Sequence, residues 1–126
     1  VAAQRAMAHI APAVTVVLPT LSDERLLWEH EGGSATRDQW RGWGVDEVVI
    51  KDGASACQIW RGAEHVTVPA RQVTSVVDTT GAGDSFNAAY LAARLAGADC
   101  VVAAQEGHAL AAEVIAKPGA IVDVGE

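Results

Sequence analysis

The stretch "VVDTTGAGDSFNAAYLAARLAG", residues 76–97, decides how the rest of the chain is interpreted. β-Branched residues lead into a turn of small residues, an aspartate follows, and a helical pattern then continues to Gly97. A helix that starts directly after such a turn has backbone N–H groups without partners in its first turn. Those donors and the positive end of the helix dipole favour a bound anion. The stretch therefore predicts a loop that binds a phosphate group.

The small residues of this turn suit close contact with a bound anion. Gly81 and Gly83 have no Cβ atom to keep a phosphate from the backbone, and they allow φ values that other residues resist. Ala82 between them leaves the space open. No Lys-Ser/Thr pair follows the glycines and their spacing is not GxGxxG, so the turn matches neither a Walker A loop nor a dinucleotide fingerprint.

Asp84 is unexpected beside a phosphate, because a carboxylate repels another anion. One interpretation makes it the N-cap of the following helix, a position that favours Asp. The other makes it a general base, which takes a proton from an attacking hydroxyl while a phosphoryl group is transferred. The spacing alone leaves both interpretations open.

Composition excludes several classes of function. The 126 residues suffice for one domain with a hydrophobic core. Nine Lys and Arg against sixteen Asp and Glu give a net charge of −7, and the basic residues form no patch, so we expect no nucleic-acid partner. No apolar run approaches the ~20 residues of a membrane-spanning helix, and no signal segment is visible. We therefore expect a cytoplasmic protein without membrane contact, and the first residue, Val1, suggests a trimmed chain.

Cysteine, tryptophan and histidine form no pattern typical of a ligand or metal site. We expect Cys57 and Cys100, which are far apart, to be small buried hydrophobic residues. Packing in the core or between subunits is the simpler interpretation of the four tryptophans, Trp28, Trp40, Trp43 and Trp60. Three histidines lack the spacing of zinc ligands, namely His9, His30 and His65.

Strands alternate with helices along the chain. Helices are predicted over residues 2–10, from Ser22 as N-cap to a stop at Gly32 and Gly33, and over residues 36–44, 84–96 and 99–116. Strands are predicted over residues 14–18, 46–50 and 73–77, with a hairpin that joins 56–60 to 65–69 through Gly62. The closing "AIVDVGE" is a last strand or a surface tail. This order predicts an α/β fold with a mostly parallel sheet and an antiparallel hairpin at its edge.

The motif "DTTGAGDSFNAAYLAA" resembles the second signature of the ribokinase-like carbohydrate kinases, the PfkB family. In that family the last Asp of GAGD is the catalytic base, which implies this role for Asp84. The preceding backbone amides form an anion hole for the transferred phosphoryl group, which implies Gly81, Ala82 and Gly83.

The resemblance also implies residues that bind or organise ions. The opening Asp and the second Thr of the motif, Asp78 and Thr80 here, help to hold a monovalent cation such as K⁺ or to organise the phosphate loop. The segment "VVLPTLSDERLLW" is similar to the one in which the family has Asn-x-x-Glu, which organises Mg²⁺ and phosphates. The matching residues are Thr20 and Asp23, so a carboxylate is kept and the Asn amide is lost, with Glu24 as an alternative carboxylate. Asp23 could instead only interact with the helix dipole.

Two more segments resemble the nucleotide-binding parts of the family. "VVIKDGASAC" resembles the strand and turn that pass under the nucleotide, which implies Lys51, Gly53 and Ser55 as neighbours of ATP. "GHALAAEVIAKPGA" resembles the late helix beside the adenine, which implies His108 and Gly119. The alternatives are a solvated charge for Lys51 and a packed ring for His108.

The resemblance implies a partial three-layer α/β/α sandwich, in which residues 1–126 form the C-terminal nucleotide-binding portion. The family's N-terminal sugar-binding part and small β lid do not appear in these residues. Within the family, the motifs most resemble those of kinases that phosphorylate 2-dehydro-3-deoxygluconate with ATP and Mg²⁺. Ribose, fructose and nucleosides are alternative substrates, and the full-length protein could be a homo-oligomer. Two non-enzymatic alternatives are a nucleotide-binding regulator without turnover and a structural piece that pairs with a partner chain through its sheet edge.

Overall fold

A computed structural model gives the structure of the protein and describes residues 2–118. These residues belong to two compact units, Val1–Thr67 and Val68–Glu126, which are called unit 1 and unit 2 below and are described in turn. No helix in the described part is long and apolar enough to cross a membrane.

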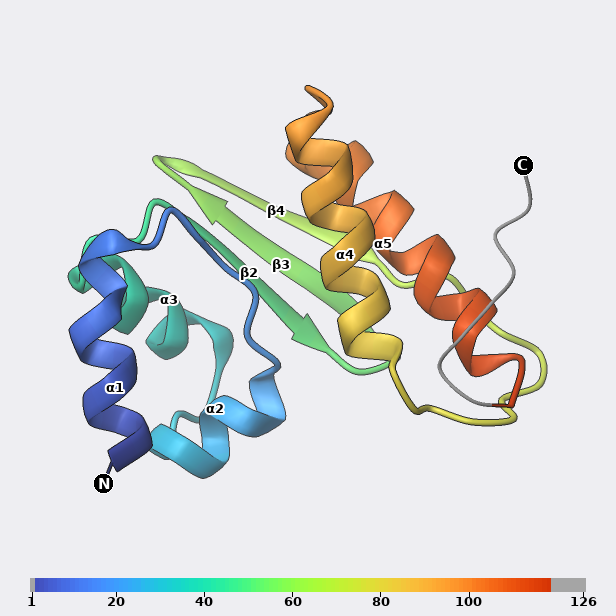
Figure 1. Cartoon of the computed structure of the whole chain (residues 1–126), viewed down its shortest axis with the longest axis horizontal. Helices are drawn as coiled ribbons and strands as arrows, with labels where there is room; N and C mark the ends of the chain where they lie inside the picture. The colour runs from blue at the N-terminus through green and yellow to red at the C-terminus, as the bar shows by residue number, and fades with distance from the viewer. Residues whose placement is uncertain (1, 119–126) are drawn as a thin grey trace. The chain divides into compact units, whose positions relative to one another are not determined.

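Unit 1 combines short helices with a sheet (Figure 1). Its helices are α1 (Ala2–Ile10), the 3₁₀ turn η1 (Ala11–Ala13), α2 (Leu21–Trp28) and α3 (Gly33–Gly42). The strands are β1 (Val16–Val17), β2 (Glu47–Asp52), β3 (Ala56–Arg61) and β4 (Glu64–Pro69), which ends just beyond the unit boundary. The order across the sheet is β1-β2-β3-β4.

The sheet is mixed rather than mostly parallel. Strands β1 and β2 run parallel, with Val17 beside Val48, whereas β2 and β3 run antiparallel, with Val48 opposite Trp60. Loop length explains this correction. Only residues 53–55 join β2 to β3, and a parallel neighbour needs a crossover of about a dozen residues or more. The predicted hairpin is confirmed, with Gly62 at φ +58 in its turn.

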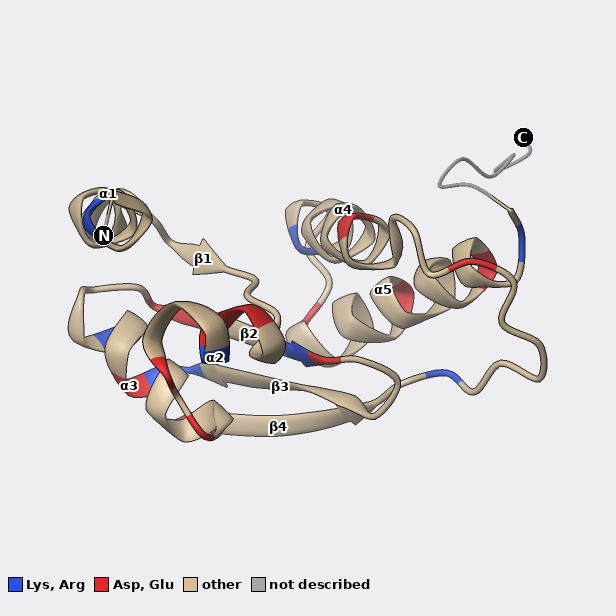
Figure 2. Ribbon diagram, turned by 90° about the horizontal axis from the view of Figure 1, so that it is seen from below, with Lys and Arg blue, Asp and Glu red and all other residues tan. Residues whose placement is uncertain are grey.

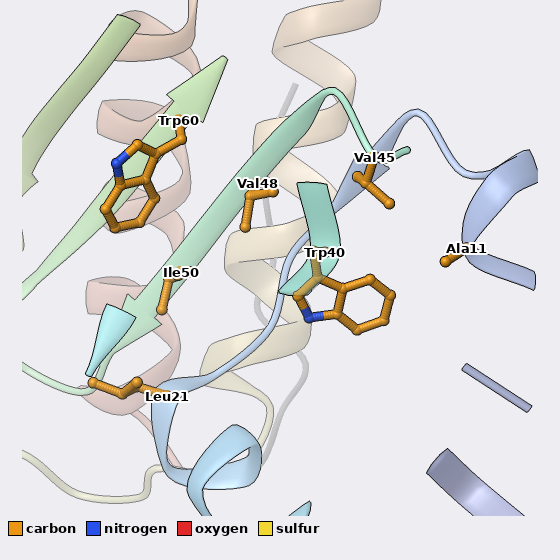
Figure 3. Close-up of a cluster of buried hydrophobic side chains, with 7 residues drawn as sticks. All are labelled: Ala11, Leu21, Trp40, Val45, Val48, Ile50 and Trp60. Atoms are coloured by element: carbon orange, nitrogen blue, oxygen red, sulfur yellow. The ribbon is translucent and has the colours of Figure 1, made fainter. Parts of the chain in front are cut away.

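A buried cluster holds the helices of unit 1 onto the sheet (Figure 3). Trp40 of α3 is 5% exposed and lies with Val48 and Ile50 of the central strand β2. The cluster also contains Ala11, Leu21, Val45 and Trp60. Trp28 and Trp43 are half-buried beside it, and their rings pack edge to face at 5.4 Å. The expected packing role of the tryptophans is therefore confirmed for Trp40 and Trp60. Cys57 is buried as predicted, whereas the same prediction for Cys100 is wrong, because this residue begins α5 and is only partly buried.

The predicted bounds of α2 are wrong, and α3 spans Gly33–Gly42 instead of the predicted residues 36–44. Helix α2 begins at Leu21 with Thr20 as its N-cap, so Ser22 lies inside the first turn. It ends at Trp28, where Glu29 takes the left-handed conformation at φ 59, well before Gly32 and Gly33. Gly33 instead begins α3. A Cβ atom at this position would lie only 3.2 Å from the Trp60 ring, which explains a glycine here. The glycine serves close packing rather than a helix stop.

Unit 2 contains the long helices α4 (Ala82–Leu95) and α5 (Cys100–Ile115), which pack against each other (Figure 1). Gly97, at φ +97, follows the end of α4. Asp99 caps α5, since its Oδ1 accepts the N–H of Val102 at 2.9 Å. Both predicted helices are confirmed. The basic residues are dispersed over the chain, as Figure 2 shows for the described part.

The predicted strand at residues 73–77 does not form. Its valines suggested a strand, yet Val76 and Val77 are each 56% exposed. The N–H of Val77 donates to the carbonyl of Ile115, at the end of α5, instead of to a neighbouring strand. Tertiary context overrides the β propensity of these residues. The closing segment "AIVDVGE" lies outside the described residues.

Glu24 gives a test of the unit 1 core. Its side chain is 3% exposed, Trp40 Nε1 donates to it at 3.3 Å, and burial raises the pKa of its carboxyl. A carboxyl whose pKa is higher in the folded than in the unfolded protein stabilises the fold while it is protonated. This contribution is complete below the pKa of the unfolded state and is lost as pH rises through the pKa of the folded state. From pH 4.5 upward, the free energy of unfolding of the wild type should therefore fall relative to that of Glu24→Gln. Urea denaturation of the intact protein at several pH values measures this difference, and parallel pH curves would contradict it.

Candidate active site

The predicted phosphate loop is ordered by its own hydrogen bonds. Asp78 Oδ1 accepts the N–H of Thr80 at 2.9 Å, and the Thr79 carbonyl accepts that of Ala82 at 3.3 Å. Gly81 then takes the left-handed conformation at φ +78 and serves as the N-cap of α4. A residue with a Cβ atom would be strained at this φ, which explains a glycine here.

The first turn of α4 presents unpaired donors. The earliest bond along the helix runs from the N–H of Ser85 to the Gly81 carbonyl at 2.9 Å. The N–H groups of Gly83 and Asp84 precede it and donate to no backbone carbonyl of residues 2–118. Both residues are exposed. The start of α4 can therefore accept an anion from solvent.

Asp84 lies beside these donors, in the first turn of α4. Its side chain is exposed, and the N-cap of the helix is Gly81. The N-cap interpretation of Asp84 is therefore wrong. A carboxylate at this position interacts favourably with the helix dipole. Because it is exposed, it is also able to take a proton from a bound hydroxyl.

The end of α5 holds the segment that enters the loop. The carbonyl of Ile115 accepts two backbone N–H groups, from Val77 at 2.8 Å and from Asp78 at 3.1 Å. Carbonyl groups in the last turn of a helix have no partner inside the helix, so they are available for such contacts. This contact was missed from the sequence, because nothing in the residue types around Ile115 marks its backbone oxygen as a partner.

His108 is packed into unit 2. Its side chain is 9% exposed, its Nε2 lies 3.1 Å from the carbonyl oxygen of Val68, and its ring meets that of Phe86 edge to face at 5.0 Å. Gly107 beside it has no room for a side chain, since a Cβ atom would lie 2.7 Å from Phe86. The structure therefore shows the packed alternative for His108, and its contact with a nucleotide stays a prediction.

The other predicted residues lie in unit 1, where the parallel strands β1 and β2 end. Thr20 follows β1 and forms a parallel bridge with Lys51 of β2, whose N–H donates to the Pro19 carbonyl at 3.0 Å. The adjoining turn contains Gly53 at φ +53 and Ser55, whose N–H donates to Asp52 at 3.0 Å. Ligands of α/β proteins commonly bind outside the carboxyl ends of parallel strands. The structure thus brings the two segments of unit 1 together at a suitable edge.

The two carboxylates that follow Thr20 differ in accessibility. Asp23 is exposed in the first turn of α2, whereas Glu24 is buried beside Trp40 and His30. A ligand can reach Asp23 and cannot reach Glu24. Of the two, Asp23 is therefore the better candidate for a metal contact.

No group of three or more His, Cys, Asp or Glu side chains within the described residues could hold a metal ion. Mg²⁺ keeps several waters and often takes only one or two carboxylates together with substrate phosphates. Asp23 in unit 1 and Asp78 in unit 2 each have carboxylate oxygens, which Mg²⁺ and K⁺ prefer as ligands, and a contact of either residue with an ion stays a prediction. Gly119 lies outside the described residues.

Comparison with known proteins identifies the family. A family model described as pfkB family carbohydrate kinase matches residues 2–125. The chain belongs to this family. It is 40% identical to a 2-dehydro-3-deoxygluconokinase of Dickeya dadantii and 38% identical to one of Escherichia coli K12, each over 94% of its length. The chain spans 39% and 40% of those two relatives.

Solved structures of pfkB-type kinases have the same fold. A candidate ribokinase II of E. coli, in complex with ATP and Mg²⁺, matches 93% of the chain with a TM-score of 0.83 and 27% identity. Aminoimidazole riboside kinase of Salmonella enterica, with its riboside and an ATP analogue, matches 90% with a TM-score of 0.81 and 27% identity. The matches span 38% and 40% of those chains. The fold is therefore α/β and ribokinase-like, as predicted.

The packed His108 gives a pH-dependent stability. Burial lowers the pKa of its imidazole, and the hydrogen bond to Val68 opposes this shift in part. A histidine whose pKa is lower in the folded protein makes its full contribution to stability above the pKa of the unfolded state, near 6.5. Below that pH the unfolded state binds a proton that the folded state does not bind, so stability is lost. The free energy of unfolding of the wild type should therefore fall below pH 6.5 relative to that of His108→Gln. Chemical denaturation of the intact protein between pH 7.5 and 5 measures the two curves, and a constant difference would contradict this account.

Proposed function

We propose that the protein to which this chain belongs is an ATP-dependent sugar kinase. It transfers the γ-phosphoryl group of ATP to a primary hydroxyl, and the substrate is 2-dehydro-3-deoxy-D-gluconate, which becomes its 6-phosphate. The observation that carries the proposal is the start of α4, where unpaired backbone N–H groups and the exposed carboxylate of Asp84 occur in one helical turn.

The transfer needs a base and a site for negative charge. Asp84 accepts the proton of the sugar hydroxyl as its oxygen attacks the γ-phosphorus, a P–O bond forms, and the bond to the β-phosphate oxygen breaks to release ADP. The predicted backbone amides of Gly81, Ala82 and Gly83 face the phosphoryl group in this proposal. The Ala82 N–H, which donates to the Thr79 carbonyl at 3.3 Å in this structure, would have to exchange that partner for the phosphoryl group. Fixed donors of this kind stabilise the charge of the transition state without reorganisation.

The remaining predicted residues are proposed to contact the ions and the nucleotide. Mg²⁺, when bound with ATP, neutralises charge on the phosphates, and Asp23 is proposed to approach it. Asp78 and Thr80 organise the phosphate loop, in line with their hydrogen bond, and a K⁺ ion beside them is part of the proposal. Contacts to ATP are proposed for four residues, Lys51, Gly53, Ser55 and Gly119. For His108, which the resemblance also implied beside the nucleotide, the buried ring supports the packed alternative instead.

The names of relatives support the sugar acid as substrate. Relatives from D. dadantii, E. coli and Haemophilus influenzae that match nearly the whole chain are named 2-dehydro-3-deoxygluconokinase. A fructokinase of Rhizobium leguminosarum matches 56% of the chain and a nucleoside kinase of Methanocaldococcus jannaschii 60%. Fructose and nucleosides are therefore the alternatives to test. A cytoplasmic location, a homo-oligomer and the absence of a nucleic-acid partner belong to the same proposal.

Substitution of Asp84 tests the mechanism. In the full-length enzyme, Asp84→Asn should lower kcat by about 10²- to 10⁴-fold, because the amide cannot accept the proton. Binding of ATP should persist, since the backbone donors remain. Steady-state kinetics and calorimetric titration with ATP measure both quantities. Asp46→Asn, at an exposed position immediately before β2, is the matched control and should behave as wild type. Near wild-type kcat in Asp84→Asn would exclude its role as base.

A sugar panel tests the substrate. We expect ADP release from the intact protein with 2-dehydro-3-deoxygluconate, at a higher kcat/KM than with ribose, fructose or adenosine. A higher kcat/KM with another member of the panel would show that the proposed substrate is wrong and that the proposed kinase activity is right. Binding of ATP without sugar-dependent ADP release would favour the alternative of a regulator without turnover.

A further inference from the structure

Helix α5 holds both ends of the segment that leads into the phosphate loop. At one end, His108 Nε2 lies 3.1 Å from the Val68 carbonyl oxygen. At the other, the Ile115 carbonyl accepts the N–H groups of Val77 and Asp78. His108 and Ile115 are seven residues apart, so they lie on the same face of α5, about two turns from each other. Residues 70–79 contain no helix or strand, so the segment is held at its ends, by β4 and His108 around Val68 and by Ile115 at Val77 and Asp78.

The same histidine contacts the helix that carries Asp84. Phe86, two residues after Asp84, is 2% exposed and packs against the His108 ring. Gly107 allows the phenyl ring to lie directly on α5, because any larger residue would place a Cβ atom 2.7 Å from it. The buried ring of Tyr90, one turn further along α4, stacks with Phe86 at 6.0 Å. His108 is therefore in contact with both the segment that enters the loop and the helix that leaves it.

We propose that His108 is a positioning residue for phosphoryl transfer, which holds the phosphate loop and Asp84 in register through Val68 and Phe86. The inference rests on the proposed function, since it assigns the role of His108 in that reaction. In this role Nε2 carries the proton and donates to the Val68 carbonyl, and the ring does not need to touch nucleotide or sugar.

Two properties of the site support the inference. The ring is almost completely buried, so little of it remains to contact a ligand from solvent. The Val68 carbonyl would lose its partner if the imidazole were replaced by an apolar group, and a buried acceptor without a partner is unfavourable. The segment after Val68 would then shift, and the loop at its far end would shift with it.

The test uses the full-length protein and four variants. His108→Leu removes the donor, and His108→Gln keeps an amide N–H at a similar reach. Gly107→Ala pushes on Phe86 and leaves His108 in place. His65→Leu is the control, because His65 stacks on Trp60 at 4.4 Å and bonds to a side chain in unit 1, outside the proposed site.

Three quantities are measured: kcat at saturating substrates, the Kd of ATP, and hydrogen exchange of the backbone amides of residues 76–85. The kcat is expressed per ATP-binding site, and these sites are counted by titration. For His108→Leu we expect kcat to fall about 10- to 10²-fold, as misplaced reacting groups commonly do, with an unchanged Kd of ATP. Exchange of the loop amides should become faster. His108→Gln should restore most of kcat, Gly107→Ala should lower kcat in the same way, and His65→Leu should match wild type.

Four outcomes would overturn the inference. A higher Kd of ATP with kcat recovered at saturation would make His108 a nucleotide contact. Lower stability with unchanged kcat, Kd and loop exchange in both His108→Leu and Gly107→Ala would leave it a purely structural residue. An inactive wild-type protein would remove the proposed function together with this inference, whereas an active wild type impaired by Asp84→Asn and not by His108→Leu would overturn this inference alone. Gly107→Ala keeps the test decisive if His108→Leu does not fold.

Discussion

The unpaired backbone donors at the start of α4 are the constraint on which the account depends. A loop of seven residues has many polar groups, and three of the backbone N–H groups in "DTTGAGD" have partners within unit 2. Asp78 holds the N–H of Thr80, Thr79 holds that of Ala82, and Ile115 holds that of Asp78. Among the donors that remain, those of Gly83 and Asp84 lie in the first turn of α4, where both residues are exposed. A charge that develops there meets dipoles that are already aligned, which is the most effective form of electrostatic stabilisation.

The two units contribute different chemistry to the proposed reaction. Unit 2 contains the phosphate loop and Asp84, whereas unit 1 contains the turn after β2 and the exposed Asp23 after β1. In unit 1 the parallel bridge between Thr20 and Lys51 keeps these segments adjacent. Glu24 is buried in unit 1 and accepts a hydrogen bond from Trp40. Of the two neighbouring carboxylates, Glu24 therefore belongs to the core and Asp23 is the one that a ligand can reach.

Local signals in the sequence predicted the helices and the hairpin well, while contacts between distant residues decided the errors. The glycine-rich turn, Gly97 and Asp99 mark the bounds of α4 and α5, and Gly62 marks the hairpin. Gly33 was taken for a helix stop, because its contact with Trp60, 27 positions away, leaves no local trace. The strand predicted at 73–77 failed for a similar reason, since Ile115 pairs with Val77.

The candidate site shows the same division. The residues of the phosphate loop follow from the motif, and the structure adds the accessibility of Asp84 and the donors beside it. The supporting residues could not be predicted. His108 has a partner 40 positions away, and Phe86 and Gly107 matter through a contact between two helices. Periodicity indicates that such residues are buried and does not indicate what they hold in place.

A crystal structure of the intact protein with ADP, Mg²⁺, the sugar acid and a fluoroaluminate ion tests the central claim most directly. The fluoroaluminate stands for the phosphoryl group during transfer. We predict its fluorides at hydrogen-bond distance from backbone nitrogens of the turn at residues 81–84, and a carboxylate oxygen of Asp84 about 2.6–3.2 Å from the attacking hydroxyl. A fluoroaluminate bound away from the start of α4, or an Asp84 carboxylate turned away from the sugar, would contradict the account.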